Sequence, residues 1–117
     1  MKKVVLFFLV GALLVSTLAL AGCSRGNDED LVGTWAWEDF ADYTYVFNSD
    51  GTGTRGVTGA RESFTWSTSS DQLRINREGD IPSGEIRNER WTYTIDGDVF
   101  SIVSRQDTSR SYSYVRQ

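Results

Sequence analysis

The sequence of 117 residues contains no histidine, a single cysteine and a single proline. The absence of His removes the commonest zinc ligand and the usual general base at neutral pH. With Cys23 as the only thiol, an intramolecular disulfide is excluded. Asp96 and Asp98 flank Gly97, where Asp is expected for turn geometry rather than for acid–base chemistry. We therefore expect a non-enzymatic protein that needs no cofactor and no metal.

The first 22 residues have the layout of an export signal. Lys2 and Lys3 precede an apolar segment, residues 4–20, that carries no charge. This segment is short for a permanent membrane span of about 20 apolar residues. It ends in Leu-Ala-Gly-Cys at residues 20–23, which resembles the bacterial lipobox. The resemblance implies a helical signal peptide over residues 1–22 that is removed after Cys23 is lipidated.

A lipidated Cys23 would act as the anchor of the mature protein, and the polar residues 24–30 would act as a tether. Two or three acyl chains on one residue hold a protein durably at a membrane. We therefore expect a location in the cell envelope, either on the outer face of the cytoplasmic membrane or in the outer membrane. The alternative is an incidental thiol behind an ordinary secretory signal.

Removal of residues 1–22 leaves 95 residues (117 − 22), enough for one domain, which we place at residues 31–117. Both lysines are lost, so ten Arg stand against sixteen Asp plus Glu, a formal charge of −6 (10 − 16). Such an acidic domain is a poor partner for nucleic acid. The charge favours a basic partner or simply keeps an exported monomer in solution.

Apolar and aromatic residues recur at every second position along most of this domain, as in half-buried strands. Asp50-Gly51 and Asp96-Gly97 are typical of tight hairpin turns. Residues 52–58 form a weaker strand that contains Gly53 and Gly56, and residues 78–85 form one long loop. About eight short strands with short connections favour a closed antiparallel up-and-down barrel, with a two-sheet sandwich as the alternative. The alternating positions are Trp35 and Trp37; Tyr43, Tyr45 and Phe47; Phe64 and Trp66; Leu73 and Ile75; Trp91, Tyr93 and Ile95; Phe100 and Ile102; and Tyr112 and Tyr114.

Gly33-Thr34-Trp35 resembles the Gly-x-Trp signature of lipocalins. In that family the Trp closes one end of the barrel and an Arg near the end of the last strand packs across it. The resemblance implies that Gly33, Trp35 and Arg116, with Arg110 as second choice, close this barrel. The order of the motifs is similar to that of small bacterial lipocalin-like lipoprotein domains of uncharacterised function. These motifs are residues 31–37, Tyr45-Val46-Phe47 before Asp50-Gly51-Thr52-Gly53, Phe64-Thr65-Trp66, and Tyr93-Thr94-Ile95-Asp96-Gly97-Asp98. The chain departs from the best-known lipocalins in its short length and in lacking a C-terminal helix, a Thr-Asp-Tyr motif and a disulfide.

Aromatic side chains inside a small barrel are either core or the lining of an apolar pocket. Trp66 and Tyr93, then Phe47 and Trp91, are the candidates for binding a small hydrophobic ligand near an open end. The alternative function is a protein-interaction or inhibitor module that uses its acidic surface and the 78–85 loop against a basic protein. The first function needs an internal cavity, and the second needs an exposed patch.

Overall fold

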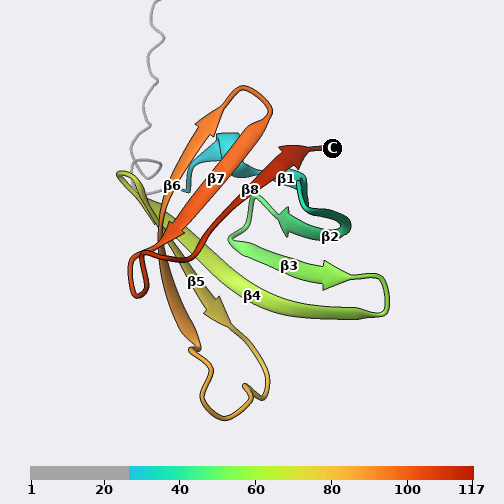
Figure 1. Cartoon of the computed structure of the whole chain (residues 1–117), viewed down its shortest axis with the longest axis vertical. Helices are drawn as coiled ribbons and strands as arrows, with labels where there is room; N and C mark the ends of the chain where they lie inside the picture. Colours follow the sequence, from blue (N-terminus) through green and yellow to red (C-terminus); the bar gives the residue numbers. More distant parts are fainter. Residues whose placement is uncertain (1–26) are drawn as a thin grey trace, which may run out of the picture.

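The computed structural model describes residues 27–117 and is all-β, with almost no helix (Figure 1). One short 3₁₀ turn, η4, precedes eight strands. Their bounds are η4 (Glu29–Leu31), β1 (Gly33–Trp37), β2 (Phe40–Phe47), β3 (Thr52–Val57), β4 (Ala60–Ser69), β5 (Gln72–Arg77), β6 (Asn88–Asp96), β7 (Val99–Ser104) and β8 (Ser111–Arg116).

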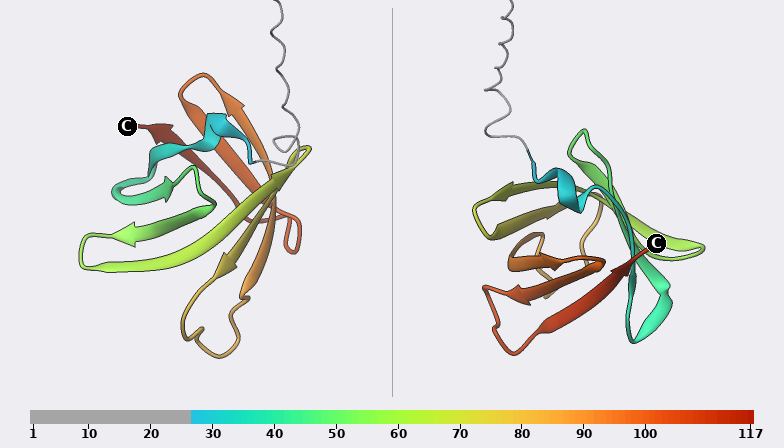
Figure 2. Two further views of the ribbon diagram at one scale, coloured as in Figure 1. Left: turned by 180° about the vertical axis from the view of Figure 1, so that it is seen from behind. Right: turned by 90° about the horizontal axis from the view of Figure 1, so that it is seen from above.

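The eight strands form a closed barrel in sequence order, and each strand is antiparallel to both of its neighbours. Closure comes from pairing of β1 with β8, in which Trp35 lies opposite Arg116 and Trp37 opposite Tyr114. The views from behind and from above show the ring of strands (Figure 2). The predicted up-and-down barrel is confirmed, and the sandwich alternative is wrong. Closure leaves no unpaired sheet edge.

The predicted signal peptide and Cys23 lie outside the described residues. Within residues 27–117, no helix is long and apolar enough to cross a membrane.

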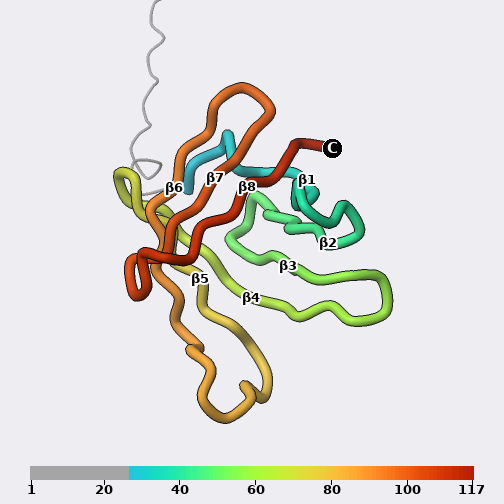
Figure 3. The backbone as a smooth tube through the Cα atoms, in the orientation of Figure 1, coloured from blue at the N-terminus to red at the C-terminus, as the bar shows by residue number. Residues whose placement is uncertain are grey.

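Antiparallel order sends the connections alternately to the two ends of the barrel, as the backbone trace shows (Figure 3). We call the first end the sealed end: it carries residues 27–32 and the tight turns after β2, β4 and β6. Gly51 and Gly97 in two of these turns have positive φ angles of 90° and 61°, as expected for Asp-Gly turns. We call the other end the mouth: it carries the β1–β2, β3–β4, β5–β6 and β7–β8 connections, including the long loop at residues 78–87.

The sealed end is closed by η4 and by the last strand. Leu31 is fully buried, and its carbonyl accepts a hydrogen bond of 2.9 Å from the indole nitrogen of Trp35. The guanidinium of Arg116 lies 4.2 Å from the centre of the Trp35 ring. Arg116 Nη2 also donates to the carbonyl of Asp30 at 3.0 Å. The two ends of the described chain are thus joined over one tryptophan by a cation–π contact and hydrogen bonds.

Part of the expected tether belongs to the folded barrel. Asn27 donates from its side chain to the carbonyl of Trp66 and accepts from the backbone N–H of Thr68. Asp28 accepts a 2.7 Å hydrogen bond from the hydroxyl of Tyr93. Residues 27–30, assigned to a tether from their polar composition, therefore lie against the sealed end, because the barrel offers partners for their polar groups.

The core fills the half of the barrel nearer the sealed end. Its fully buried side chains include Phe47, Phe64 and Phe100, and the ring of Phe47 contacts each of the other two at a ring-centre distance of 5.7 Å. Gly53 in the weak third strand makes room for this cluster. A Cβ there would come within 2.4 Å of the Val46 carbonyl and 2.6 Å of the Phe64 ring. The glycine thus marks a close approach of ring and backbone.

If η4 is an integral part of the domain, truncation of its buried side chain will destabilise the whole barrel. We expect Leu31→Ala to lower the free energy of unfolding by about 2–5 kcal/mol, the range for a buried Leu. Urea unfolding followed by tryptophan fluorescence measures this. Glu29→Ala, on an exposed side chain of the same turn, is the control and should change stability by less than about 0.5 kcal/mol. Equal stability of Leu31→Ala and the parent chain would show that η4 is not part of the core.

Candidate functional site

The interior at the mouth is not filled. A pocket of about 230 Å³ opens there, at the end of the barrel opposite η4. It adjoins a broader hollow of about 430 Å³ that reaches the 78–87 loop. The residues that line the pocket come from β1, β2, β3, β6, β8 and the β7–β8 connection: Trp37, Tyr43, Tyr45, Arg55, Glu89, Trp91, Arg110, Tyr112 and Tyr114.

One side of the pocket is a run of four rings, Trp37, Tyr43, Trp91 and Tyr112, which we call the aromatic wall. Trp37 contacts Tyr43 and Tyr112 edge to face, with ring centres 6.0 and 5.8 Å apart. Trp91 contacts Tyr112 in the same way at 6.0 Å. Edge-to-face contacts of this kind favour a defined arrangement of the rings. The wall therefore offers an ordered apolar surface beside the opening.

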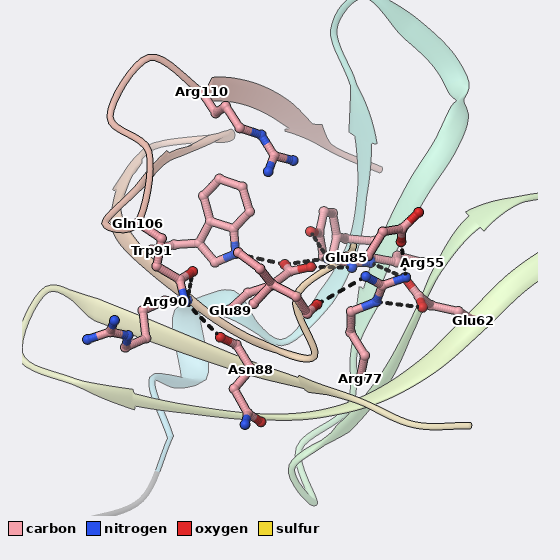
Figure 4. A network of polar contacts seen from close by, with 12 residues as sticks. Arg55, Glu62, Arg77, Glu85, Asn88, Glu89, Arg90, Trp91, Gln106 and Arg110 are labelled. Carbon is pink, nitrogen blue, oxygen red and sulfur yellow. Dashed lines mark hydrogen bonds and ion pairs between the residues drawn. The ribbon is translucent and has the colours of Figure 1, made fainter. Parts of the chain in front are cut away.

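The other side of the pocket holds a buried guanidinium. Arg55 is only 7% exposed, and it faces Glu89 in a two-point ion pair with N–O distances of 2.8 and 2.6 Å (Figure 4). Its Nε donates to Glu62 at 2.7 Å, and its Nη1 donates to the hydroxyl of Tyr45 at 2.8 Å. Burial alone would lower the pKa of Arg55, but the hydrogen bonds to Glu89, together with the charge of Glu89 and the nearby Tyr45 and Tyr43, outweigh burial and raise that pKa. Arg55 thus stays charged inside the barrel.

The charges continue from Arg55 toward the long loop, as Figure 4 shows. Glu62 also accepts from Arg77 at 2.9 Å, and Arg77 pairs with Glu85 of the 78–87 loop at 2.9 Å. Arg77 Nη1 donates to the carbonyl of Ile86. We call Arg55, Glu62, Arg77, Glu85 and Glu89 the ionic cluster. It fixes the loop to the wall of the mouth.

Two tyrosines that line the pocket, Tyr43 and Tyr114, have hydroxyls without a hydrogen bond within residues 27–117. Tyr114 is 4% exposed, and burial together with the nearby Tyr45 raises its pKa. Tyr43 is half-buried, and burial raises its pKa as well. Both therefore remain protonated at neutral pH and have an O–H to donate.

Arg110 lies at the rim of the pocket, above Trp91 (Figure 4). Its guanidinium carbon is 5.9 Å from the centre of the Trp91 ring. Its Nε donates a long hydrogen bond of 3.4 Å to the hydroxyl of Tyr112, which raises the pKa of Arg110. In the part of the chain that the structure describes, Arg110 forms no ion pair. Arg110 was the second candidate for the arginine that packs across Trp35. That prediction is wrong, because Arg110 lies at the mouth and Arg116 covers Trp35.

The structure brings Gly33, Trp35 and Arg116 together at the sealed end. A Cβ on Gly33 would lie 3.5 Å from Arg116 Nη1, and Arg116 covers Trp35. Cys23 lies outside the described residues. Gly33, Trp35 and Arg116 have a structural role, because they close the barrel at the end opposite the pocket.

Of the four ligand-binding candidates, only Trp91 lines the mouth pocket. Phe47 is buried in the core. Tyr93 bonds to Asp28 at the sealed end. Trp66 donates from its indole nitrogen to the carbonyls of Asn48 and Thr52, and borders a separate hollow between β4, β5 and β6. Alternation correctly puts such side chains inside, but it does not say at which end of a strand they lie.

The sequence reasoning missed most of the mouth. The prediction followed only the apolar and aromatic positions of the alternating pattern, so Arg55, Glu62, Arg77 and Glu89 were not considered. A signal was present: Glu62 precedes Phe64 by two residues, and Glu89 precedes Trp91 by two, so each shares the face of an aromatic residue. Within residues 27–117, no group of three or more His, Cys, Asp or Glu side chains gathers as a metal site requires.

Glu62 gives the ionic cluster a measurable pH dependence. Burial of its carboxylate opposes ionisation, but hydrogen bonds from Arg55 and Arg77 outweigh burial and lower its pKa below the ordinary value of 4.5. Its contribution to stability is therefore present above the pKa of the unfolded chain and lost as pH falls through the lower folded pKa.

We expect Glu62→Gln to reduce the free energy of unfolding at pH 7 by about 1–3 kcal/mol, because charged hydrogen bonds are lost. The difference from the parent chain should shrink as pH falls below about 4. Urea unfolding at pH 7, 5 and 3 measures it, with the exposed Glu38→Gln as control. A difference that is constant across this pH range would contradict the assigned role of Glu62.

Comparisons with known proteins identify a family but no characterised relative. Neither the curated proteins nor the solved structures contain a match to the chain. A family model described as a family of unknown function, DUF5640, matches residues 29–117. The match begins in η4 and runs through β8, so it covers the whole barrel. The chain belongs to the family of unknown function DUF5640.

Proposed function

We propose that this protein is a lipid-anchored, non-enzymatic binding module of the bacterial cell envelope, with a lipocalin-like barrel that takes up a small, largely apolar ligand through its mouth. The observation that carries the proposal is the pocket beside the aromatic wall, open at one end of a barrel whose other end is closed by η4 and Arg116. Concave sites lined by aromatic side chains with a few polar groups are the usual form of small-molecule sites.

The size of the pocket limits the ligand. Its volume of about 230 Å³ is below the roughly 300 Å³ at the lower end of common ligand sites. Eight-stranded barrels have room for at most one small ligand besides their own side chains. A molecule of one or two rings is therefore the appropriate size.

The charges at the pocket favour a small ligand over the alternative, a basic protein partner. The lining contains two arginines, Arg55 and Arg110, and one glutamate, Glu89. The pocket lining itself, with more positive than negative charge, would not attract a basic partner.

The position of Asn27 at the sealed end determines how the proposed anchor would orient the barrel at the membrane. Asn27, the first described residue, is bonded to β4 at that end. Cys23 precedes it by four residues, which reach at most about 14 Å. A lipid on Cys23 would thus hold the sealed end near the membrane and turn the mouth toward the aqueous side. The ligand would then enter from solution rather than from the bilayer.

Small neutral aromatic molecules test the pocket directly. We expect benzyl alcohol to change the tryptophan fluorescence of the purified full chain in a saturable way, and Trp37→Leu to weaken this binding about fivefold or more, because a wall of the pocket is lost. Phe40→Leu is the matched control: Phe40 is exposed at the same end but outside the lining. Equal weakening by both variants, or no saturable binding, would contradict a ligand site at the mouth.

The anchor is tested by Cys23→Ala. We expect the variant to lose labelling by palmitate and to move from the membrane fraction to the soluble fraction, because no acyl chain remains. Fractionation and metabolic labelling measure this, with Ser24→Ala as control. A variant that stays in the membrane fraction with unchanged labelling would show that Cys23 is not the anchor.

A further inference from the structure

The charged groups of the pocket differ in how many hydrogen bonds and ion pairs they form. Glu89 accepts from two nitrogens of Arg55 and, at 3.0 Å, from the indole nitrogen of Trp91. Arg55 also bonds to Glu62 and Tyr45. These two opposite charges therefore satisfy each other. Arg110 is left as the pocket cation without an ion-pair partner within residues 27–117.

The two carboxylates whose charges influence Arg110, Glu89 and Asp107, already accept hydrogen bonds from other groups. Glu89 is held by Arg55 and Trp91, and Asp107 accepts from the hydroxyl and the backbone N–H of Ser109. Within residues 27–117 the Arg110 guanidinium makes one hydrogen bond, from Nε to the Tyr112 hydroxyl, so its terminal nitrogens still have N–H groups to donate. Such a guanidinium at a pocket rim suits the two oxygens of a carboxylate.

The hydroxyls add further donors. Tyr114 lines the pocket with its side chain almost fully buried, and its O–H has no acceptor in the described part of the chain. Buried polar groups are nearly always hydrogen-bonded, so this hydroxyl calls for a partner inside the pocket. Tyr43 presents a second O–H in the same region. The pocket thus offers donors from several directions, and its one carboxylate, Glu89, is already occupied.

The rings of the aromatic wall indicate what the uncharged part of the ligand would be. Trp37 and Trp91 face the opening as parts of the aromatic wall. Arg110 already lies over the Trp91 ring, in the position that a cationic ligand would take over an aromatic face. A positively charged ligand would have to displace Arg110, whereas a negatively charged one would add a partner to it.

We infer that the pocket binds a small planar organic acid, with its carboxylate on Arg110 and its apolar ring against Trp37 and Trp91. This inference rests on the proposed function and names the class of its ligand. Charge-assisted hydrogen bonds of a guanidinium supply selectivity for the acid, and the aromatic wall supplies contact with the ring.

Three probes with the same ring and different charge test the inference: benzoate, benzyl alcohol and benzylammonium. Titrations of the purified full chain, followed by tryptophan fluorescence and by calorimetry, should show benzoate binding about tenfold or more tightly than the other two, as expected for one charge-assisted contact. Arg110→Gln should remove this preference and bring the affinity for benzoate to that for benzyl alcohol measured on the same variant. Arg105→Gln is the matched control, because Arg105 lies in the same connection but bonds to Thr92.

The outcomes distinguish the inference of an acid ligand from the proposal of a small-molecule site at the mouth. Equal affinity for all three probes, tighter binding of benzylammonium, or a benzoate preference that survives Arg110→Gln would overturn the inference of an acid ligand, while binding of the ring would still support a small-molecule site. Absence of saturable binding by every probe would overturn both.

Discussion

Arg55 carries a positive charge into the barrel, and the mouth is organised around that charge. An ion in a low-dielectric interior costs several kcal/mol unless it is paired and hydrogen-bonded. Glu89, Glu62 and Tyr45 supply the partners from β6, β4 and β2, so one guanidinium fixes side chains on three other strands. Tyr45 marks the boundary: its ring stacks on Phe47 in the core, and its hydroxyl accepts from Arg55. Between Tyr45 and the mouth, charged side chains occupy interior positions that would be apolar in a completely filled barrel.

Much of the fold could be predicted because it depends on local patterns. Alternating aromatic positions gave the strands, and Asp-Gly at residues 50–51 and 96–97 gave two turns with the expected backbone angles. Closure followed from the need to leave no free sheet edge. The contact of Arg116 with Trp35 was expected from a family resemblance, not from periodicity, and the structure contains that contact.

The site was harder to predict because it depends on where along each strand a residue stands. Arg55 and Arg77 lie in the carboxyl-terminal halves of odd-numbered strands, whereas Glu62 and Glu89 lie near the amino ends of even-numbered ones. In an up-and-down barrel these four positions meet at the same end. Each shares the face of buried residues, but a pattern based on apolar and aromatic positions does not include it. Alternation within single strands also does not give the register between strands that brings these opposite charges together.

The ionic cluster is poorly explained by stability alone. Replacing buried ion pairs with well-packed apolar residues is often neutral or stabilising, so a mouth filled with Leu and Ile would serve folding at least as well. The cluster instead keeps the pocket open and polar on one side, and it fixes the 78–87 loop through Arg77 and Glu85. Local departures from the rules of core packing tend to coincide with functional sites. Because the departure here is confined to the mouth, beside an ordered aromatic wall, binding at this end explains it better than folding does.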